Sequence, residues 1–149
     1  MAYQELAHEL LNNMLYLSRR RVQRQIDAAV RGEAFILHYL ASYSEAVLPG
    51  DLGEVMAVSS ARIASALNSL EKKGLITRQI NTSDRRQILV CLTPEGKLQA
   101  DQYYHCTIAA ISNMLEQLGD QDAMDYVRII SKLVTVLSKM DEAPTQQRN

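Results

Sequence analysis

The 149-residue chain has little of several features that mark particular classes of protein. Its two cysteines, Cys91 and Cys106, lie in separate predicted elements without a CxxC spacing, which excludes a disulfide framework or a zinc knuckle and fits a reducing compartment. Its apolar runs stop well short of the roughly 18–20 residues that cross a bilayer, and no basic segment followed by an apolar one opens the chain. We therefore expect a cytoplasmic protein without membrane contact.

Sequence motifs of catalysis are also missing. The chain contains no G-x-S-x-G and no H-E-x-x-H, and its six glycines are spread so widely that they form no glycine-rich phosphate loop. His8, His38 and His105 lie on three different predicted helices, and none belongs to an HxxxH pair. We therefore expect no enzyme activity, no cofactor and no metal site.

The chain also has no large excess of positive or negative charge, because 16 Lys and Arg residues are balanced by 17 Asp and Glu residues, for a net charge of -1. Domains that bind nucleic-acid phosphates usually carry a basic excess, so this total at first argues against such a partner. The total hides a segment of opposite sign, however. Residues 59–97 hold seven Lys or Arg against three acidic residues, a net +4, whereas residues 1–58 carry -2 and residues 98–149 carry -3.

In the first half of the chain, apolar residues at helical spacing predict three helices. They indicate one long helix over 3–29, since no Gly or Pro intervenes before Gly32, and a second helix over 33–43. After Pro49 and Gly50, the pair Asp51 and Glu54 has the spacing of a capping box that starts a short helix over 52–56.

The second half begins with a helix that Ser59 or Ser60 caps and that ends at Gly74. The apolar period then changes to two, which predicts a hairpin of strands 75–80 and 88–92. Thr93 is placed to cap a helix from Pro94 to Gly119, and a final helix covers 121–140. The predicted fold is mainly α with a small β-hairpin, and a helix-turn-helix followed by a hairpin is the winged-helix arrangement.

The second helix of the helix-turn-helix has an outer face of small polar and basic residues. Short polar side chains let a helix approach DNA bases closely, and arginine can bind guanine through two hydrogen bonds. We expect DNA contacts from this face, namely Ser59, Ser60, Arg62, Ser65, Asn68, Ser69 and Lys72. Such a face is also typical of a helix that is simply solvated, and the sequence leaves that alternative open.

The hairpin carries a second candidate set: Arg78, Ser83, Asp84, Arg85 and Arg86. Asp84 and Arg86 are two residues apart at its tip, so we expect the carboxylate to hold the guanidinium extended for a narrow minor groove. The alternative is an ordinary surface ion pair. A further basic run, Arg19 to Arg21 with Arg24, spreads around the predicted first helix, and we favour a solvated helix end there over phosphate contact.

Residues 84–97, DRRQILVCLTPEGK, resemble the wing and following helix start of the MarR family of multiple-antibiotic-resistance regulators. Residues 67–78, LNSLEKKGLITR, are similar to the end of that family's recognition helix and its first wing strand. The resemblance implies a homodimeric regulator, a repressor relieved by a small-molecule effector, that binds a pseudo-palindromic site on double-stranded DNA. It also implies that Arg86 is the minor-groove arginine and that Asp84 orients it.

The resemblance suggests a division of labour along the chain. Residues 1–30 and 98–141 would form dimerisation helices, residues 31–97 the DNA-binding lobe and residues 142–149 a flexible tail, within one structural domain. The residues support this division independently, because a chain this short cannot bury both wide apolar stripes of its terminal helices by itself. The alternative is a compact monomeric bundle.

A small-molecule effector would require a crevice in the fold. Aromatic residues that the fold could bring to one crevice are Tyr16, His38, Tyr39, Tyr43 and Tyr103. A tyrosine-rich set is equally typical of the edge of a core with exposed hydroxyl groups. Two other functions stay open: a winged helix that binds another protein without reading DNA, and a redox- or metal-sensing member of the same family.

Overall fold

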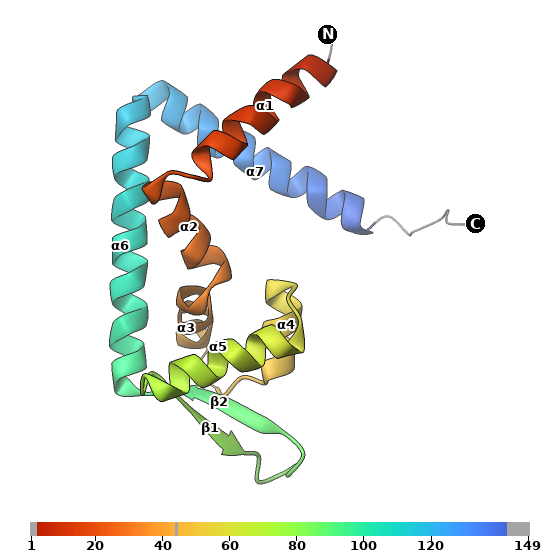
Figure 1. Ribbon diagram of the computed structural model, residues 1–149, viewed down its shortest axis with the longest axis vertical. Helices are drawn as coiled ribbons and strands as arrows, with labels where there is room; N and C mark the ends of the chain where they lie inside the picture. Colours follow the sequence, from red (N-terminus) through yellow and green to blue (C-terminus); the bar gives the residue numbers. More distant parts are fainter. Residues whose placement is uncertain (1–2, 44, 143–149) are drawn as a thin grey trace, which may run out of the picture. The chain divides into compact units, whose positions relative to one another are not determined.

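The computed structural model describes residues 3–43 and 45–142. Within these residues it is mainly helical with one two-stranded antiparallel hairpin, which confirms the predicted fold class (Figure 1). Its elements are α1 (Tyr3–Leu17), α2 (Arg21–Arg31), α3 (Glu33–Ser42), α4 (Pro49–Met56), α5 (Ser60–Lys72), β1 (Ile76–Ile80), β2 (Ile88–Leu92), α6 (Pro94–Leu118) and α7 (Asp120–Glu142). None of the described helices is long and apolar enough to span a membrane.

The chain divides into two compact units, residues 1–110 and residues 111–149. The first unit contains the hairpin, α1 to α5 and most of α6. The second contains the end of α6 and α7. From residue 143 onward, the predicted flexible tail lies outside the described residues.

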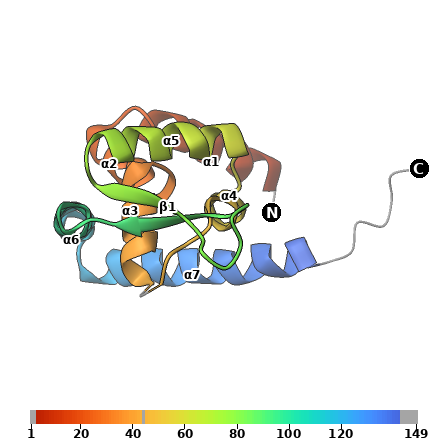
Figure 2. The same ribbon diagram turned by 90° about the horizontal axis from the view of Figure 1, so that it is seen from below.

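The hydrophobic core of the first unit lies where α3, α4, α5 and the base of the hairpin meet. It consists of Ile36, Leu37, Leu40, Val47, Leu52, Ile63, Leu67, Leu70, Ile76, Val90 and Ala100. Val47 and Val90 exchange two backbone hydrogen bonds of 3.1 and 2.8 Å, which attach the segment before α4 to the edge of β2. β2 thus lies between β1 and this segment. The hairpin extends beyond α5 in Figure 1 and lies alongside it in Figure 2.

Local hydrogen bonds fix the ends of α5 and the start of α6, as the sequence predicts. The Ser59 hydroxyl accepts a hydrogen bond from the Arg62 N–H at 3.3 Å, and Gly74 ends the helix with a φ of 72°. The Thr93 hydroxyl accepts from the Gly96 N–H at 3.0 Å and donates to the Gly74 carbonyl at 2.7 Å. Thr93 therefore joins the start of α6 to the end of α5.

The prediction of one continuous helix over residues 3–29 is wrong, because α1 ends at Leu17 and α2 begins at Arg21. The connecting turn tightens: the N–H groups of Arg19 and Arg20 donate to carbonyls three residues back. The Ser18 hydroxyl donates to the Leu15 carbonyl at 2.8 Å, a local side-chain bond of the kind that competes with helix continuation.

The predicted capping box at Asp51 is also wrong. The helix α4 begins earlier, with Pro49 at its first position, and its N-cap is Leu48 without a side-chain cap. Asp51 instead lies in the first turn, where its charge faces the positive end of the helix dipole.

Candidate nucleic-acid interface

The outer face of α5 presents the polar residues that the sequence analysis singled out. Ser59, Ser60, Arg62, Ser65, Asn68 and Lys72 are exposed, and Ser69 is half-buried. The opposite face holds the helix to the core through three buried residues, Ile63, Leu67 and Leu70. A rigid helix therefore presents short polar side chains to solvent over its whole length.

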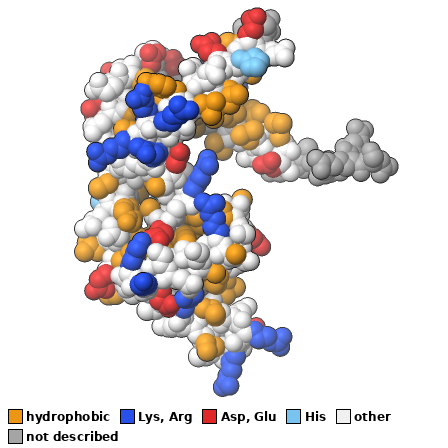
Figure 3. Space-filling model, viewed as in Figure 1, with side chains coloured by type: hydrophobic (Ala, Val, Ile, Leu, Met, Phe, Trp, Pro, Cys, Tyr) orange, Lys and Arg blue, Asp and Glu red, His pale blue; other side chains and the backbone are white. Residues whose placement is uncertain are grey.

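The tip of the hairpin is a turn stabilised by hydrogen bonds from side chains to the backbone. Asp84 Oδ1 accepts from the Arg86 N–H at 3.1 Å, and the Asp84 carbonyl accepts from the Gln87 N–H at 2.9 Å. Asn81 Oδ1 accepts from the Ser83 N–H at 2.9 Å. Arg85 and Arg86 are exposed, and basic side chains project from the tip of the hairpin in Figure 3.

The expected contact between the Asp84 carboxylate and the Arg86 guanidinium is therefore wrong. Among the described residues, the ion pairs do not include these two side chains. An Asp at the first position of a turn commonly bonds the backbone two residues on, and Asp84 Oδ1 accepts that bond here. Asp84 orders the backbone that carries Arg86 rather than its guanidinium.

Arg78 differs from the tip arginines because its side chain points to α5. Its Nε and Nη2 donate to Glu71 Oε2, at 3.0 and 2.5 Å, and Nη2 also donates to Asn68 Oδ1 at 2.7 Å. The hydrogen bonds between Arg78 and Glu71 lower the pKa of the Glu71 carboxyl group and raise the pKa of the Arg78 guanidinium. Two residues predicted separately as DNA contacts, Arg78 and Asn68, thus belong to one hydrogen-bonded group.

A second ion pair, which was not predicted from the sequence, joins the end of α5 to α3. Lys73 Nζ donates to Glu33 Oε2 at 2.5 Å across 40 positions of sequence. Partial burial raises the pKa of Glu33, but the hydrogen bonds from Lys73 and Ser69 and the charge of Lys73 outweigh it, so the pKa is lowered. No pattern in the sequence pairs these two residues.

Comparison with known proteins shows the family to which this chain is related. A model described as a winged helix DNA-binding domain matches residues 33–111. The uncharacterised HTH-type transcriptional regulator YwhA of Bacillus subtilis is 31% identical over 143 residues, which cover 89% of this chain and 99% of YwhA. The B. subtilis HTH-type transcriptional repressor YetL is 30% identical over 90 residues, 60% of this chain and 54% of YetL. A MarR transcriptional regulator from Methanosarcina mazei has the same fold, with a TM-score of 0.68, 16% identity and coverage of 91% and 99% of the two chains.

The chain belongs to the MarR family of winged-helix transcriptional regulators. In the terms of that family, α5 is the recognition helix and the β1–β2 hairpin is the wing. The basic segment 59–97 coincides with these two elements and the start of α6.

The arginine run lies at the junction of α1 and α2, away from the wing within the first unit (Figure 1). Arg20 lies over the Tyr16 ring, with its guanidinium carbon 4.0 Å from the ring centroid. Arg19, Arg21 and Arg24 are exposed. Tyr16, a predicted effector residue, thus contacts an arginine of its own segment.

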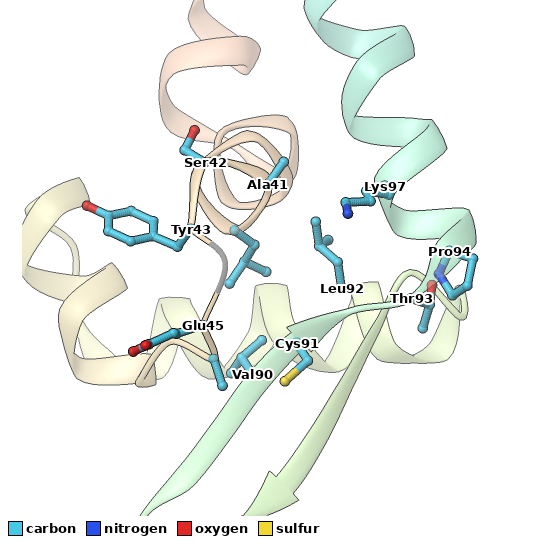
Figure 4. A pocket seen from close by; sticks show the side chains of 12 residues that line it. Ala41, Ser42, Tyr43, Glu45, Val90, Cys91, Leu92, Thr93, Pro94 and Lys97 are labelled. Atoms are coloured by element: carbon cyan, nitrogen blue, oxygen red, sulfur yellow. The ribbon is translucent and has the colours of Figure 1, made fainter.

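The five predicted effector residues do not line one pocket. Tyr39 stacks on Phe35, with ring centroids 6.0 Å apart, and lies tilted against Tyr43 at 4.7 Å. His38 stacks on Tyr104 at 5.4 Å. Tyr43 lines a pocket of about 750 Å³ between the end of α3, β2 and the start of α6. In Figure 4, Lys97 points toward this space, whereas Tyr43 and Glu45 point away from Lys97.

Tyr103 lines a different pocket, of about 500 Å³, between α2 and α6. Its other lining residues are Gln25, Ala28, Ala29, Gly32, Glu33, Ala34, Cys106 and Thr107. Gln25 Nε2 donates to the Cys106 carbonyl at 3.3 Å and so joins the two helices at this pocket. Among the described residues, no three His, Cys, Asp or Glu side chains gather as a metal site.

Proposed function

We propose that this regulator is a homodimeric repressor that reads double-stranded DNA with α5 and the wing. A small-molecule effector releases the repressor from the DNA. The observation that carries the proposal is the juxtaposition of the exposed polar face of α5 with a wing tip bearing Arg85 and Arg86. The net +4 of residues 59–97 supplies attraction to phosphates that the whole chain lacks.

In this proposal the two elements contact different grooves. The recognition helix places Ser60, Arg62, Ser65 and Asn68 along the major groove, with Ser59, Ser69 and Lys72 toward the phosphates. The wing places Arg86 in the adjacent minor groove, and Ser83, Asp84 and Arg85 form the turn that presents it. Repression is proposed by analogy with YetL, which is a transcriptional repressor, and the proposal includes no enzyme activity or cofactor.

Dimerisation is proposed because two terminal helices expose apolar faces. Every residue of α1 is exposed, with Leu10 at 60% and Met14 at 58%. In α7, Val134 is 60% exposed and Leu137 49%, and the helix buries none of its described side chains. Apolar surface on this scale marks a protein interface. We accordingly assign residues 1–30 and 98–141 to dimerisation and residues 31–97 to the DNA-binding lobe.

For the effector, the proposal favours the pocket between α2 and α6. It is mostly apolar and small enough for one aromatic molecule, and Tyr103 and Glu33 are among its lining residues. The other predicted aromatic residues, His38, Tyr39 and Tyr43, would then support the lobe rather than touch the effector.

The decisive experiment replaces Arg86 with alanine and measures binding to a site selected from randomised duplex DNA. We expect Arg86→Ala to weaken specific binding about tenfold or more without lowering thermal stability, because an inserted arginine is worth about 1–3 kcal/mol. Arg19→Ala is the matched control, since it removes one exposed arginine at the α1–α2 junction and leaves the wing intact.

A salt series separates DNA reading from protein binding. A regulator that neutralises phosphates must lose DNA affinity steeply as salt rises. If the wild type selects no sequence and shows a flat salt dependence, the proposed function is wrong and a protein-binding winged helix replaces it.

A further inference from the structure

The hydrogen-bonded group of Asn68, Glu71 and Arg78 connects the recognition helix with the first wing strand. Asn68 and Glu71 are three residues apart, so they share one face of α5, and Arg78 reaches both from β1. The Arg78 side chain is 28% exposed. Nε and Nη2 of the guanidinium thus donate to α5, and only Nη1 makes no hydrogen bond within the described residues.

Glu71 also changes what Arg78 offers to DNA. The guanidinium shares its charge with a carboxylate through two hydrogen bonds to Oε2. A phosphate would have to compete with that carboxylate for Nε and Nη2, and at Nη1 it would meet a guanidinium whose charge Glu71 already offsets. Arg78 therefore differs in kind from Arg85 and Arg86, which form no ion pair within the described residues.

The hydrogen bond from Arg78 orients the side-chain amide of Asn68. Its Oδ1 accepts from Arg78 at 2.7 Å, and its Nδ2 has no partner among the residues that the structure describes. Rotating the amide by half a turn would place an NH₂ group against the guanidinium, donor against donor. Arg78 therefore fixes which end of the amide faces inward and leaves the NH₂ group available to a ligand.

We propose that Asn68 is a specificity-determining residue that donates from Nδ2 to an acceptor on a base edge, and that Arg78 and Glu71 are its positioning residues. The inference rests on the proposed DNA binding. The matching acceptors in the major groove are guanine N7 and O6, adenine N7 and thymine O4. Arg78, which the sequence analysis placed among the DNA contacts, acts on DNA through Asn68.

The experiment compares Asn68→Ala, Arg78→Ala, Arg78→Lys and Glu71→Gln with the wild type. A site is first selected with the wild type from randomised duplex DNA. Each base pair of one half-site is then varied in turn, and affinity is measured by fluorescence anisotropy over a salt series. Thermal unfolding of every variant reports on folding.

We expect Asn68→Ala to lower affinity for the selected site about five- to tenfold, the value of one lost hydrogen bond, and to remove the preference at one position. Arg78→Ala and Arg78→Lys should weaken the preference at that same position, because lysine has no planar fork to hold Glu71 and Asn68 together. Glu71→Gln should release Arg78 toward phosphates, so binding to random DNA tightens and its salt slope steepens by about one charge per protomer.

Three results would overturn the inference. One is an Arg78→Lys variant that folds normally and keeps the full preference at the Asn68 position. Another is a loss spread equally over all positions in both Arg78 variants, which would mean a merely structural role. The third is a Glu71→Gln variant with an unchanged salt slope. A wild type that selects no sequence would instead overturn the proposed function and, with it, this inference.

Discussion

Lys73 Nζ lies 2.5 Å from Glu33 Oε2 and so joins the C-terminal end of the recognition helix to the first turn of α3. Glu33 also borders the pocket between α2 and α6 that we propose for the effector. An occupant that attracts either charge would therefore act on the position of α5. This ion pair thus connects the C-cap of the recognition helix with the lining of the proposed effector pocket.

Replacement of Glu33 by glutamine should lower the free energy of unfolding by about 0.5–1 kcal/mol at about pH 7, since the pair is partly exposed. The pKa of Glu33 is lowered in the folded protein, so its stabilisation is present above the unfolded-state pKa of about 4.3 and is lost as the pH falls through the lower folded value. The pKa of Lys73 is raised, so its charge persists to beyond about pH 10. Urea unfolding of wild type and Glu33→Gln across this range should show the difference shrinking in acid.

Glu54→Gln serves as the control, because Glu54 is exposed and forms no ion pair within the described residues. Its effect on stability should be small at every pH. A Glu33→Gln difference that stays constant into strong acid would show that the ion pair contributes nothing.

Local chemistry explains which parts of this fold are predictable from the sequence. Ser59 and Thr93 cap their helices through hydrogen bonds to neighbours in the sequence, and Gly74 ends α5 because it can adopt a positive φ. All three have the predicted roles. The break between α1 and α2 has no Gly or Pro to announce it, so apolar periodicity runs through it and predicts one helix.

The candidate site follows the same rule. Polar residues on the outer face of α5 follow from helical spacing alone. The Arg78 contact with Asn68 spans ten positions and the Lys73 contact with Glu33 spans 40, so both depend on how α5 packs on its neighbours. A list of exposed polar residues cannot distinguish a residue that touches a ligand from one that orients another side chain.

The role of Asp84 gives a sharp test of the wing. Its Oδ1 accepts from the Arg86 backbone, so an amide oxygen at that position should serve as well as a carboxylate. We expect Asp84→Asn to retain DNA affinity within about threefold and Asp84→Ala to weaken it further, with a loss of about 0.5–1 kcal/mol in turn stability. Anisotropy with the selected site measures both variants. Equal losses in Asp84→Asn and Asp84→Ala would restore a role for the carboxylate charge.

A charge on the apolar face of α7 should prevent dimerisation. Leu137 is 49% exposed in the single chain, and Leu137→Glu would bury an unpaired carboxylate in the proposed interface. Sedimentation should show a dimer for the wild type and a monomer for Leu137→Glu. Lys132→Glu is the matched control, because Lys132 lies on the polar face of the same helix, and it should stay dimeric. A monomeric wild type at micromolar concentration would refute the proposed dimer.

Gly96 tests how tightly the wing base is joined to α6. It is buried in the first turn of α6, and a Cβ added there would lie only 1.9 Å from the Leu75 carbonyl oxygen, which belongs to the backbone and cannot rotate away. That carbonyl also accepts the Thr93 N–H at 3.1 Å, so any shift breaks the junction of hairpin and helix. We expect Gly96→Ala to destabilise the protein by about 2–4 kcal/mol, through overpacking.

Gly50→Ala is the control: nothing lies within 4 Å of its added Cβ, and inside α4 the change should be neutral or stabilising by up to about 1 kcal/mol. Urea unfolding midpoints that fall equally for both variants would mean that close packing at Gly96 does not hold the wing in place.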